Sequence, residues 1–404
     1  MTTRHRHAPI WLMGLSNASF GLFGGFTSVV FPQLLAAQHV PETQIASLTA
    51  ATFLPGLFGC FVAPILDVRY SRRLYATVLA AVASILLVCA ILQQQNIPAE
   101  TALLVAGFAS VWLSASALGG WLSSVVPTDA KNTVSIWFQL ANVCGGGTMA
   151  ALALPLLRNT PPRPGALALG GLVMLPTLIF LWIPAPGPDR RLARESFAEF
   201  FGELLAMVRR RETLLAILLF AAPSSTFSLT NILGGLGHDF NATERMVSLL
   251  SGSGGVAAGI VGSSLLAPLA KRFALRPLYL GIGIVGGLFT LSLLVLPRAA
   301  ETLGLAILGE GLFQALAFAT LTAITMETIG HHNALAATQF GVLSSANYLP
   351  LIYMAMVDGA GYKHGGVVGS FALDAGVSIA ACLLLIPVMR AFRPRQQTIA
   401  EASD

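Results

Sequence analysis

APILDVRYSRRLY at residues 63–75 returns 204 positions later as APLAKRFALRPLY at residues 267–279. This spacing is close to half of the 404-residue chain, so it predicts two related halves. Each copy stands where one apolar helix ends in a basic turn and another apolar helix begins. Duplicated helical halves in a hydrophobic chain are typical of secondary transporters, so the question of function becomes what is moved and what drives the movement.

The composition indicates a membrane protein independently of the repeat. Hydrophobic residues make up 55% of the chain and charged residues 10%, and the mean hydropathy is +0.75. A soluble domain carries roughly 25% charged residues. The sequence pI of 9.3 comes from basic residues beside apolar runs, with no basic stripe interleaved with aromatics, so we expect the lipid bilayer as a partner and no nucleic acid.

Twelve segments are long and apolar enough to cross a hydrocarbon core of about 30 Å, which takes about 20 residues. The longest polar stretch, 185–212, separates two sets of six. The predicted spans are 9–36, 44–66, 74–94, 101–126, 133–157, 166–184, 213–237, 246–270, 277–297, 302–328, 335–357 and 366–390.

The distribution of basic residues predicts the orientation. With the N-terminus inside, the inside segments hold 18 of the 23 lysines and arginines. The outside segments hold the other five, which are Arg158, Arg163, Arg245, Arg298 and Lys363. Because cytoplasmic loops are enriched in Lys and Arg, both termini are predicted to be cytoplasmic.

The fold prediction is therefore an all-α membrane protein of twelve transmembrane helices in two pseudo-symmetric halves. Residues 1–184 form the N-terminal six-helix bundle and 213–390 the C-terminal one, with a cytoplasmic tail at 391–404. The linker 185–212 contains apolar residues near helical spacing from Phe197 to Val208, which predicts an amphipathic helix on the membrane surface. The basic lead MTTRHRH runs into an uncleaved first span.

The first copy of the repeat pairs Asp67 with the basic residues Arg72 and Arg73. This pattern resembles the loop between helices two and three of the major facilitator superfamily. The resemblance implies the major facilitator fold, and a latch in which the carboxylate and the arginines hold neighbouring helix ends together on the cytoplasmic side. In the second copy Lys271 and Arg272 stand near the position of Asp67, so we expect no matching latch there.

Two short motifs resemble one branch of that superfamily, the peptide/acetyl-CoA transporters. They are the Ala-Pro-containing run at 62–67 and ATQFGVLSS at 337–345. Bacterial members include muropeptide permeases and importers of siderophores, which implies the bacterial cytoplasmic (inner) membrane. Drug/proton exporters are the alternative branch, but their span-five motif contains a proline, and no proline directly follows CGGGT at 144–148 here.

Two acids lie well inside predicted spans, where a charge costs about 2.5–3.5 kcal/mol on insertion scales. Glu310 and Asp374 are each about eight residues into a span, or roughly 12 Å deep. Burial there favours the neutral acid, which could bind and release a proton, so both are candidates for proton coupling. The resemblance implies that spans one, four, seven and ten line the cavity, which favours Glu310 over Asp374. Asp358 and Glu327 fall at predicted span ends and receive no role.

Polar and aromatic groups on the remaining spans are the candidates for substrate binding. They are Asn17, Trp112, Gln139, Asn142, Asn231, Gln314, Asn347 and Tyr348. No lysine or arginine lies deep in any span, and a strongly anionic substrate such as a coenzyme A thioester would need one. We therefore expect a neutral, zwitterionic or partly hydrophobic solute, such as a siderophore, or a muropeptide whose carboxylate contacts edge arginines such as Arg158 or Arg245.

Enzyme motifs are absent from the sequence: there is no phosphate-binding G-x-x-x-x-G-K-[ST], no H-E-x-x-H and no G-x-S-x-G. The four cysteines lie singly in different apolar runs, so we expect no metal site, no disulfide and no cofactor. The leading hypothesis is a monomeric symporter that imports a small organic solute with protons. A proton-driven exporter is the alternative, and a non-transporting membrane sensor is the third.

Overall fold

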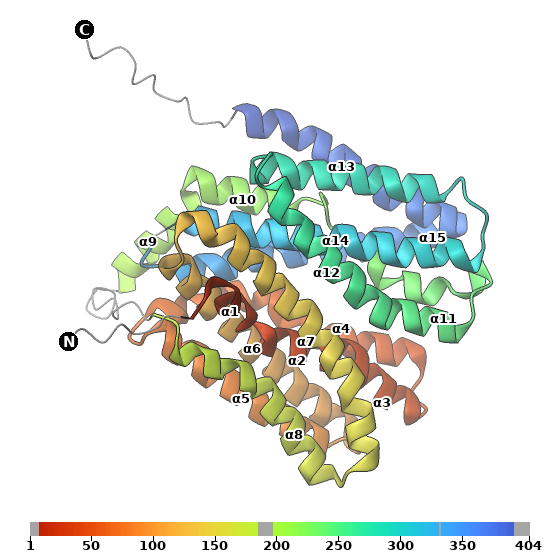
Figure 1. Cartoon of the computed structure of the whole chain (residues 1–404), viewed down its shortest axis with the longest axis horizontal. Coiled ribbons are helices and arrows are strands. Elements are labelled where there is room, and N and C mark those ends of the chain that lie inside the picture. Colours follow the sequence, from red (N-terminus) through yellow and green to blue (C-terminus); the bar gives the residue numbers. More distant parts are fainter. Residues whose placement is uncertain (1–7, 185–196, 331–332, 392–404) are drawn as a thin grey trace.

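The computed structural model describes residues 8–184, 197–330 and 333–391, and this part of the chain is helical with no strand. Figure 1 labels the helices. The first crossings contain α1 Ile10–Leu15, α2 Ala18–Gly25, α3 Phe31–Ala37, α4 Glu42–Phe58, α5 Arg72–Leu92, α6 Ile97–Val125, α7 Lys131–Asn159 and α8 Pro162–Met174. The linker helix is α9 Phe197–Arg209, and the remaining crossings contain α10 Arg211–Ala221, α11 Glu244–Leu249, α12 Gly255–Leu269, α13 Leu275–Leu293, α14 Ala300–Ile329 and α15 Ala336–Ala391.

Ten helices in the described ranges are long and apolar enough to cross a membrane. One of them, α15, holds two predicted spans, because Gly366 adopts φ +58° and breaks the helix into two arms. The predicted span 213–237 is not among the ten because it is broken. With the second arm and the broken segment, the described chain makes the twelve crossings that the sequence predicts.

The seventh crossing is not the continuous helix expected over 213–237. Helix α10 ends at Ala221, and the chain continues as the short 3-10 turns η6 Ser228–Asn231, η7 Leu233–Leu236 and η8 His238–Phe240. Pro223 follows the end of α10, and Ser225 and Phe227 have left-handed φ values of 57° and 51°. Because a proline lacks the N–H that a helix needs, Pro223 favours a break here. Hydropathy measures only how apolar a segment is, so it did not reveal the break.

Large apolar side chains are exposed on the outside of the bundle. Phe61, Met356 and Leu384 are 79%, 71% and 71% exposed, on crossings from both halves of the sequence. Contiguous apolar exposure of this kind is unfavourable in water and suits contact with lipid. The exposed surface therefore agrees with the membrane class that the composition predicts.

The two copies of the sequence repeat lie at the same end of the bundle, which we call the inner end. It carries the connections at 68–71, 126–130, 270–274 and 330–335, and α9 lies on this side in Figure 1, opposite α3 and α11. Helix α9 covers the second part of the predicted amphipathic segment; residues 185–196 lie outside the described ranges. Its side chains Leu204, Met207 and Val208 pack with Leu335, at the start of α15.

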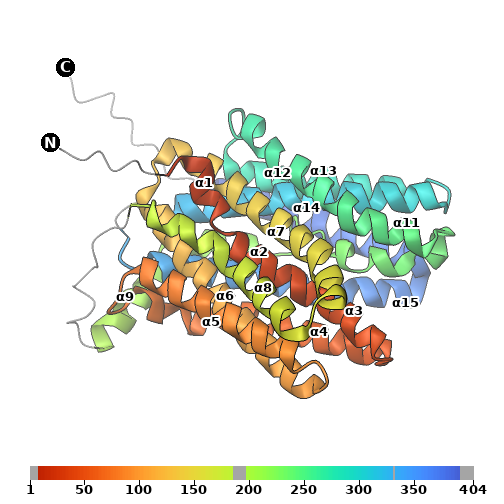
Figure 2. The ribbon, with the colours of Figure 1, turned by 60° about the horizontal axis from the view of Figure 1, so that its bottom comes forward.

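Helices α2 and α7 pack with their backbones close together, and α7 lies between α2 and α12 (Figure 2). A Cβ added at Gly21 would lie 2.3 Å from the carbonyl oxygen of Asn142, and one at Gly25 would lie 2.4 Å from that of Gly146. Small residues permit such close helix contacts in membranes. The glycine pairs hold the first and fifth crossings together beside the middle of the bundle.

Replacing Gly21 by alanine is expected to lower the melting temperature of the purified protein. The added methyl group meets backbone atoms that cannot move aside, and overpacking of this kind costs about 1–3 kcal/mol. Gly24→Ala on the same helix is the control, because its Cβ meets nothing within 4 Å. Alanine also favours a helix over glycine by about 1 kcal/mol, so equal losses from both variants would contradict the packing argument.

Candidate functional site

A cavity of about 430 Å³ lies near the middle of the bundle, between the first six crossings and the last six. None of the described residues that line it carries a charge. They are Phe20, Gly21, Gly24, Gly25, Ser28, Val29, Phe53, Phe108, Gln139, Asn142, Val143, Gly146, Thr230, Leu233, Ser251, Gly255, Gly259, Ile307, Gly311, Gln314, Ala315, Phe318 and Tyr348. The cavity therefore offers neutral hydrogen-bonding groups and aromatic faces.

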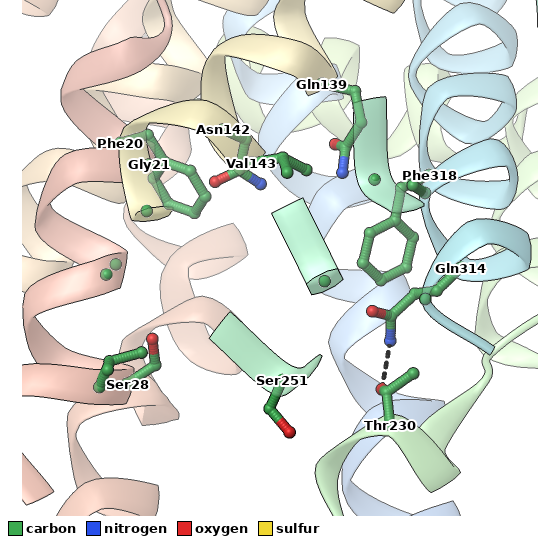
Figure 3. A pocket seen from close by; sticks show the side chains of 18 of the residues that line it. Phe20, Gly21, Ser28, Gln139, Asn142, Val143, Thr230, Ser251, Gln314 and Phe318 are labelled. Carbon is green, nitrogen blue, oxygen red and sulfur yellow. Dashed lines mark hydrogen bonds between the residues drawn. The ribbon is translucent and has the colours of Figure 1, made fainter. Parts of the chain in front are cut away.

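Three amide side chains supply most of its polarity. Figure 3 shows Gln139 and Asn142 on α7 facing Gln314 on α14 across the cavity. Gln314 Nε2 donates to Thr230 Oγ1 at 2.8 Å and to the carbonyl oxygen of Phe227 at 3.2 Å. Since these bonds use its N–H groups, the carbonyl oxygen of Gln314 is left to accept a bond from a ligand.

Phenylalanine rings form one wall of the cavity. Phe108 lies edge-on to Phe53 with ring centroids 4.9 Å apart, and its centroid is 5.8 Å from that of Phe20. All three rings line the cavity. An apolar wall of this kind packs well against the flat, apolar face of an organic solute.

Four of the eight residues predicted to bind substrate line this cavity: Gln139, Asn142, Gln314 and Tyr348. The other four lie elsewhere. Asn17 is buried and its Nδ2 donates to Phe138 O at 3.4 Å; Trp112 is buried against Gly59; Asn231 is exposed; and Asn347 is half-buried outside the cavity lining.

Glu310 lies behind the cavity wall. Its neighbour Gly311 lines the cavity, whereas the Glu310 side chain is fully buried and accepts a hydrogen bond from Thr290 Oγ1 on α13. The second carboxyl oxygen, Oε2, has no hydrogen-bond partner. Glu310 therefore lies next to the cavity without facing into it.

The break in the seventh crossing exposes carbonyl groups that a continuous helix would satisfy, and neighbouring crossings supply donors to them. Tyr353 Oη donates to Ala221 O at 2.8 Å, Ser378 Oγ to Pro223 O at 2.9 Å, and Gln314 Nε2 to Phe227 O at 3.2 Å. Side chains of α14 and α15 thus hold the break, and one of them also lines the cavity.

Asp374 lies beside this break and not at the edge of the bundle. It is 3% exposed, and its Oδ1 lies 3.0 Å from Ser228 Oγ, which also donates to Asp358 Oδ2. Asp358 was expected near a span end with cheap solvation, but that expectation is wrong: its arm of α15 continues to the turn at Gly366, and Asp358 is fully buried. A sequence signal for their pairing was present: both aspartates stand eight residues from Gly366, so a hairpin that turns there brings them to the same depth.

At the inner end, Asp67 and Arg72 form an ion pair with an Nε–Oδ1 distance of 2.7 Å. Asp67 accepts from the backbone N–H groups of Ala337 at 3.3 Å and Thr338 at 2.7 Å. Arg72 Nη2 donates to the carbonyl oxygens of Asn333 at 2.9 Å and Ala334 at 2.8 Å. The pair therefore joins the first copy of the repeat to the start of α15 in the other half of the sequence.

Other residues of the inner end have different surroundings. Within the described ranges the Arg73 side chain forms no hydrogen bond or ion pair, and its carbonyl oxygen accepts from Thr77 Oγ1. Lys131, one of the basic residues of the inner segments, is 4% exposed, and its Nζ donates to Met326 O at 2.8 Å across the halves. Lys271 and Arg272, in the second copy, are exposed.

Contacts between the halves close the cavity toward the inner end. The ring of Tyr348, which lines the cavity, lies against Gly56, and Ser345 Oγ donates to Gly56 O at 2.8 Å. Ser345 Oγ also accepts from the N–H of Cys60 at 3.2 Å. These contacts lie between the cavity and the Asp67–Arg72 pair along α4 and α15, so the halves are joined at two levels on the inner side of the cavity.

No family model matches the sequence, and no curated protein matches it significantly. Solved structures do resemble the fold. A major facilitator superfamily proton:xylose symporter bound to 6-bromo-6-deoxy-D-glucose matches with a TM-score of 0.68 and 14% identity, over 95% of this chain and 96% of that one. A major facilitator superfamily transporter, FucP, in the outward conformation matches with a TM-score of 0.71 and 14% identity, over 94% of this chain and 99% of that one. The human organic anion transporter TETRAN matches with a TM-score of 0.67 and 16% identity, over 95% of this chain and 100% of that one. At these identities the likeness shows the fold, and the chain has the major facilitator fold that the sequence resemblance implied.

Proposed function

We propose that this chain is a proton-coupled secondary transporter that imports a small, uncharged organic solute by alternating access. The observation that carries the proposal is the uncharged cavity at the middle of a twelve-crossing bundle, with the Asp67–Arg72 pair and the Ser345 contacts closing its inner side. Blocked only by contacts between halves, such a cavity can open to the inner end when the halves rotate. These contacts at the inner end support the assignment of the described conformation to an outward-facing state.

The cavity favours a solute that forms neutral hydrogen bonds and has an apolar face. Gln139 and Asn142 can each donate or accept, Gln314 can accept, and the phenylalanine wall offers no charge. The edge arginines considered for a carboxylate, Arg158 and Arg245, are exposed and do not line it. Of the two cargo classes considered, an uncharged siderophore-like solute therefore fits this cavity better than a muropeptide, whose carboxylate would lack a cation.

Protons are the proposed driving ion because buried acids lie just outside the cavity. Glu310 and Asp374 are both almost fully buried without an ion pair in the described part of the chain, and a charge there is costly. Protonation removes that cost, so each can bind a proton in one access state and release it in the other. Export by antiport uses the same geometry and differs in the direction of net flux.

Proteoliposomes with an imposed pH gradient test this function. Radiolabelled probes should include an uncharged ferric hydroxamate complex, a hexose and a muropeptide. We expect uptake of an uncharged probe when the outside is more acidic, collapse of that uptake by a protonophore, and no uphill accumulation by Glu310→Gln. Accumulation driven only by an acidic lumen would establish export instead, and absence of flux for every probe would favour the sensor.

Asn142→Ala is expected to raise the KM for the transported probe about fivefold to tenfold. Removing one amide from the cavity loses a hydrogen bond worth about 1–1.5 kcal/mol. Asn231→Ala is the matched control, since Asn231 is exposed outside the cavity. Initial uptake rates over a range of probe concentrations measure both, and an equal change in KM for the two variants would mean that the cavity is not the binding site.

A further inference from the structure

The two arms of α15 form a hairpin that brings two aspartates together inside the protein. The arms touch near the turn, where a Cβ added at Gly369 would lie 2.2 Å from the carbonyl oxygen of Gly361. Asp358 and Asp374 follow one step deeper, at equal distances of eight residues from Gly366 and roughly 12 Å from the turn. Only glycines at the crossing let the arms approach this closely.

The two carboxyl groups share one hydroxyl group and contact each other. Ser228 Oγ lies within hydrogen-bond distance of Asp358 Oδ2 and Asp374 Oδ1, and the carboxyl groups are also within hydrogen-bond reach of one another. Exposed fractions are 0% for Asp358 and 3% for Asp374. No basic side chain of the described chain forms an ion pair with either aspartate.

This geometry requires a proton. Two carboxylates in contact in an apolar interior repel each other strongly, so at least one must be neutral. Ser228 has one hydroxyl proton, so it can donate to only one carboxylate and must accept from the other carboxyl group when that group is protonated. The pair with Ser228 is therefore satisfied with one shared proton, and losing that proton leaves two adjacent negative charges.

Polar atoms without partners surround the pair. Asp358 Oδ1 and the hydroxyl of Ser370 are buried and have no hydrogen-bond partner in the described structure. The elements packed around the pair contribute one other titratable group that acts on it, Glu310 of α14, whose free oxygen Oε2 is also unpartnered. Buried polar groups are normally satisfied, so these atoms mark a place where a water or a migrating proton can be received.

The same hydroxyl connects the pair to the cavity. Ser228 opens η6 directly after Phe227, the left-handed residue of the break. Gln314 bonds both Phe227 O and Thr230 Oγ1, at 3.2 Å and 2.8 Å, and both Gln314 and Thr230 line the cavity. A displacement of Ser228 is thereby transmitted over two residues to the groups that would hold a solute.

We propose that Asp358 and Asp374, bridged by Ser228, form the proton-binding pair of this protein, and that release of their proton displaces the broken segment 222–231 and the cavity groups bonded to it. This rests on the proposed proton-coupled transport and adds the site and the moving part. Glu310 then lies beside the pair as a third buried acid that acts on it and takes part in the same proton exchange.

Infrared difference spectroscopy on the full-length protein in liposomes tests the pair without any solute. Carbon-13 labelling of aspartate carboxyl groups separates their C=O band from that of glutamate. On alkalinisation we expect a protonated aspartate band to disappear in the wild type, and to disappear at a lower pH in Asp358→Asn and Asp374→Asn, because the remaining carboxyl group has lost its acidic neighbour. Asp239→Asn is the control, because Asp239 is an exposed-surface partner of Tyr362 Oη. An unchanged band in both variants, or one that shifts only with glutamate labelling, overturns the proposal.

Ser228→Ala keeps both aspartates, so it tests the proposal even if the two asparagine variants misfold. We expect its aspartate band to shift in frequency and titration midpoint, and hydrogen exchange of the 222–231 amides to lose its dependence on the protonation of the pair. Exchange that rises with alkalinisation equally in Ser228→Ala and wild type would refute the link to the break. Transport assays separate the proton-binding pair from the proposed transport function. If the pair titrates but the protein moves no solute with protons, the pair is supported and the proposed function is refuted.

Discussion

Uptake by an Arg72→Ala variant is expected to fall to roughly one hundredth of the wild-type rate. Arg72 is the ionic partner of Asp67, whose side chain is 0% exposed, and it supplies two hydrogen bonds to the other half. Removing one partner of a buried pair costs about 3–5 kcal/mol. About 3 kcal/mol lowers the population of the closed inner end by roughly 100-fold, so the outward-facing state becomes too rare to load solute.

Thiol labelling reports the same change directly. Cys60 lies half-buried beside the Ser345 contact, so in a background without Cys89, Cys144 and Cys382 its labelling rate should rise in Arg72→Ala. Arg73→Ala is the matched control, since the Arg73 side chain has no hydrogen-bond or ionic partner among the described residues, and it should keep near wild-type uptake. If Arg73→Ala lost as much uptake as Arg72→Ala, the arginines would act only as topology anchors and the latch would be wrong.

Gly120→Trp is expected to abolish transport while the protein still folds. Gly120 lies on α6 where the halves meet, and even a Cβ there would come within 2.4 Å of the backbone nitrogen of Ala337. A whole indole ring cannot fit unless the inner end opens, whereas the two halves can each keep their own packing. Gly120→Trp should therefore elute as a monodisperse protein, label rapidly at Cys60 and show uptake no higher than empty liposomes.

The control for this wedge is Gly171→Trp on α8, whose added Cβ would meet nothing within 4 Å. It should transport normally. Because Arg72→Ala and Gly120→Trp favour the same open state, combining them should add little to the Cys60 labelling of Gly120→Trp alone. Normal uptake by Gly120→Trp would mean that the described closure at the inner end is not part of the transport cycle.

Hydropathy was enough to predict the fold, because membrane crossings have long apolar runs whatever their neighbours are. It could not predict the broken seventh crossing, since residues 222–227 remain apolar or small and their carbonyls are satisfied by side chains more than fifty residues away, such as Gln314. Asp358 was missed for a related reason: the span was expected to end at 357, and the continuation of the arm to Gly366 depends on packing against its partner arm.

The candidate site was predicted only in part, because a sequence gives residue types without the rotation of each helix. Gln139 and Asn142 are three residues apart and share the cavity face of α7, which helical spacing allows. The same spacing could not tell that Glu310 faces α13 while its neighbour Gly311 faces the cavity. The sequence likewise could not separate Arg72 from Arg73, because only the rotation of α5 shows that Arg72 faces Asp67 and the other half.

Three side chains of the first half reach across the inner end to main-chain atoms of the second half. Asp67 binds two amide groups, Arg72 binds two carbonyl oxygens, and Lys131 binds a third, that of Met326. Substitutions at the side chains of those second-half positions therefore leave the bonding atoms in place, whereas substitutions of Asp67, Arg72 or Lys131 delete them. Mutational robustness at these three contacts is thus unequal, and sequence drift should be tolerated at Ala337, Asn333, Ala334 and Met326 more readily than at Asp67, Arg72 and Lys131.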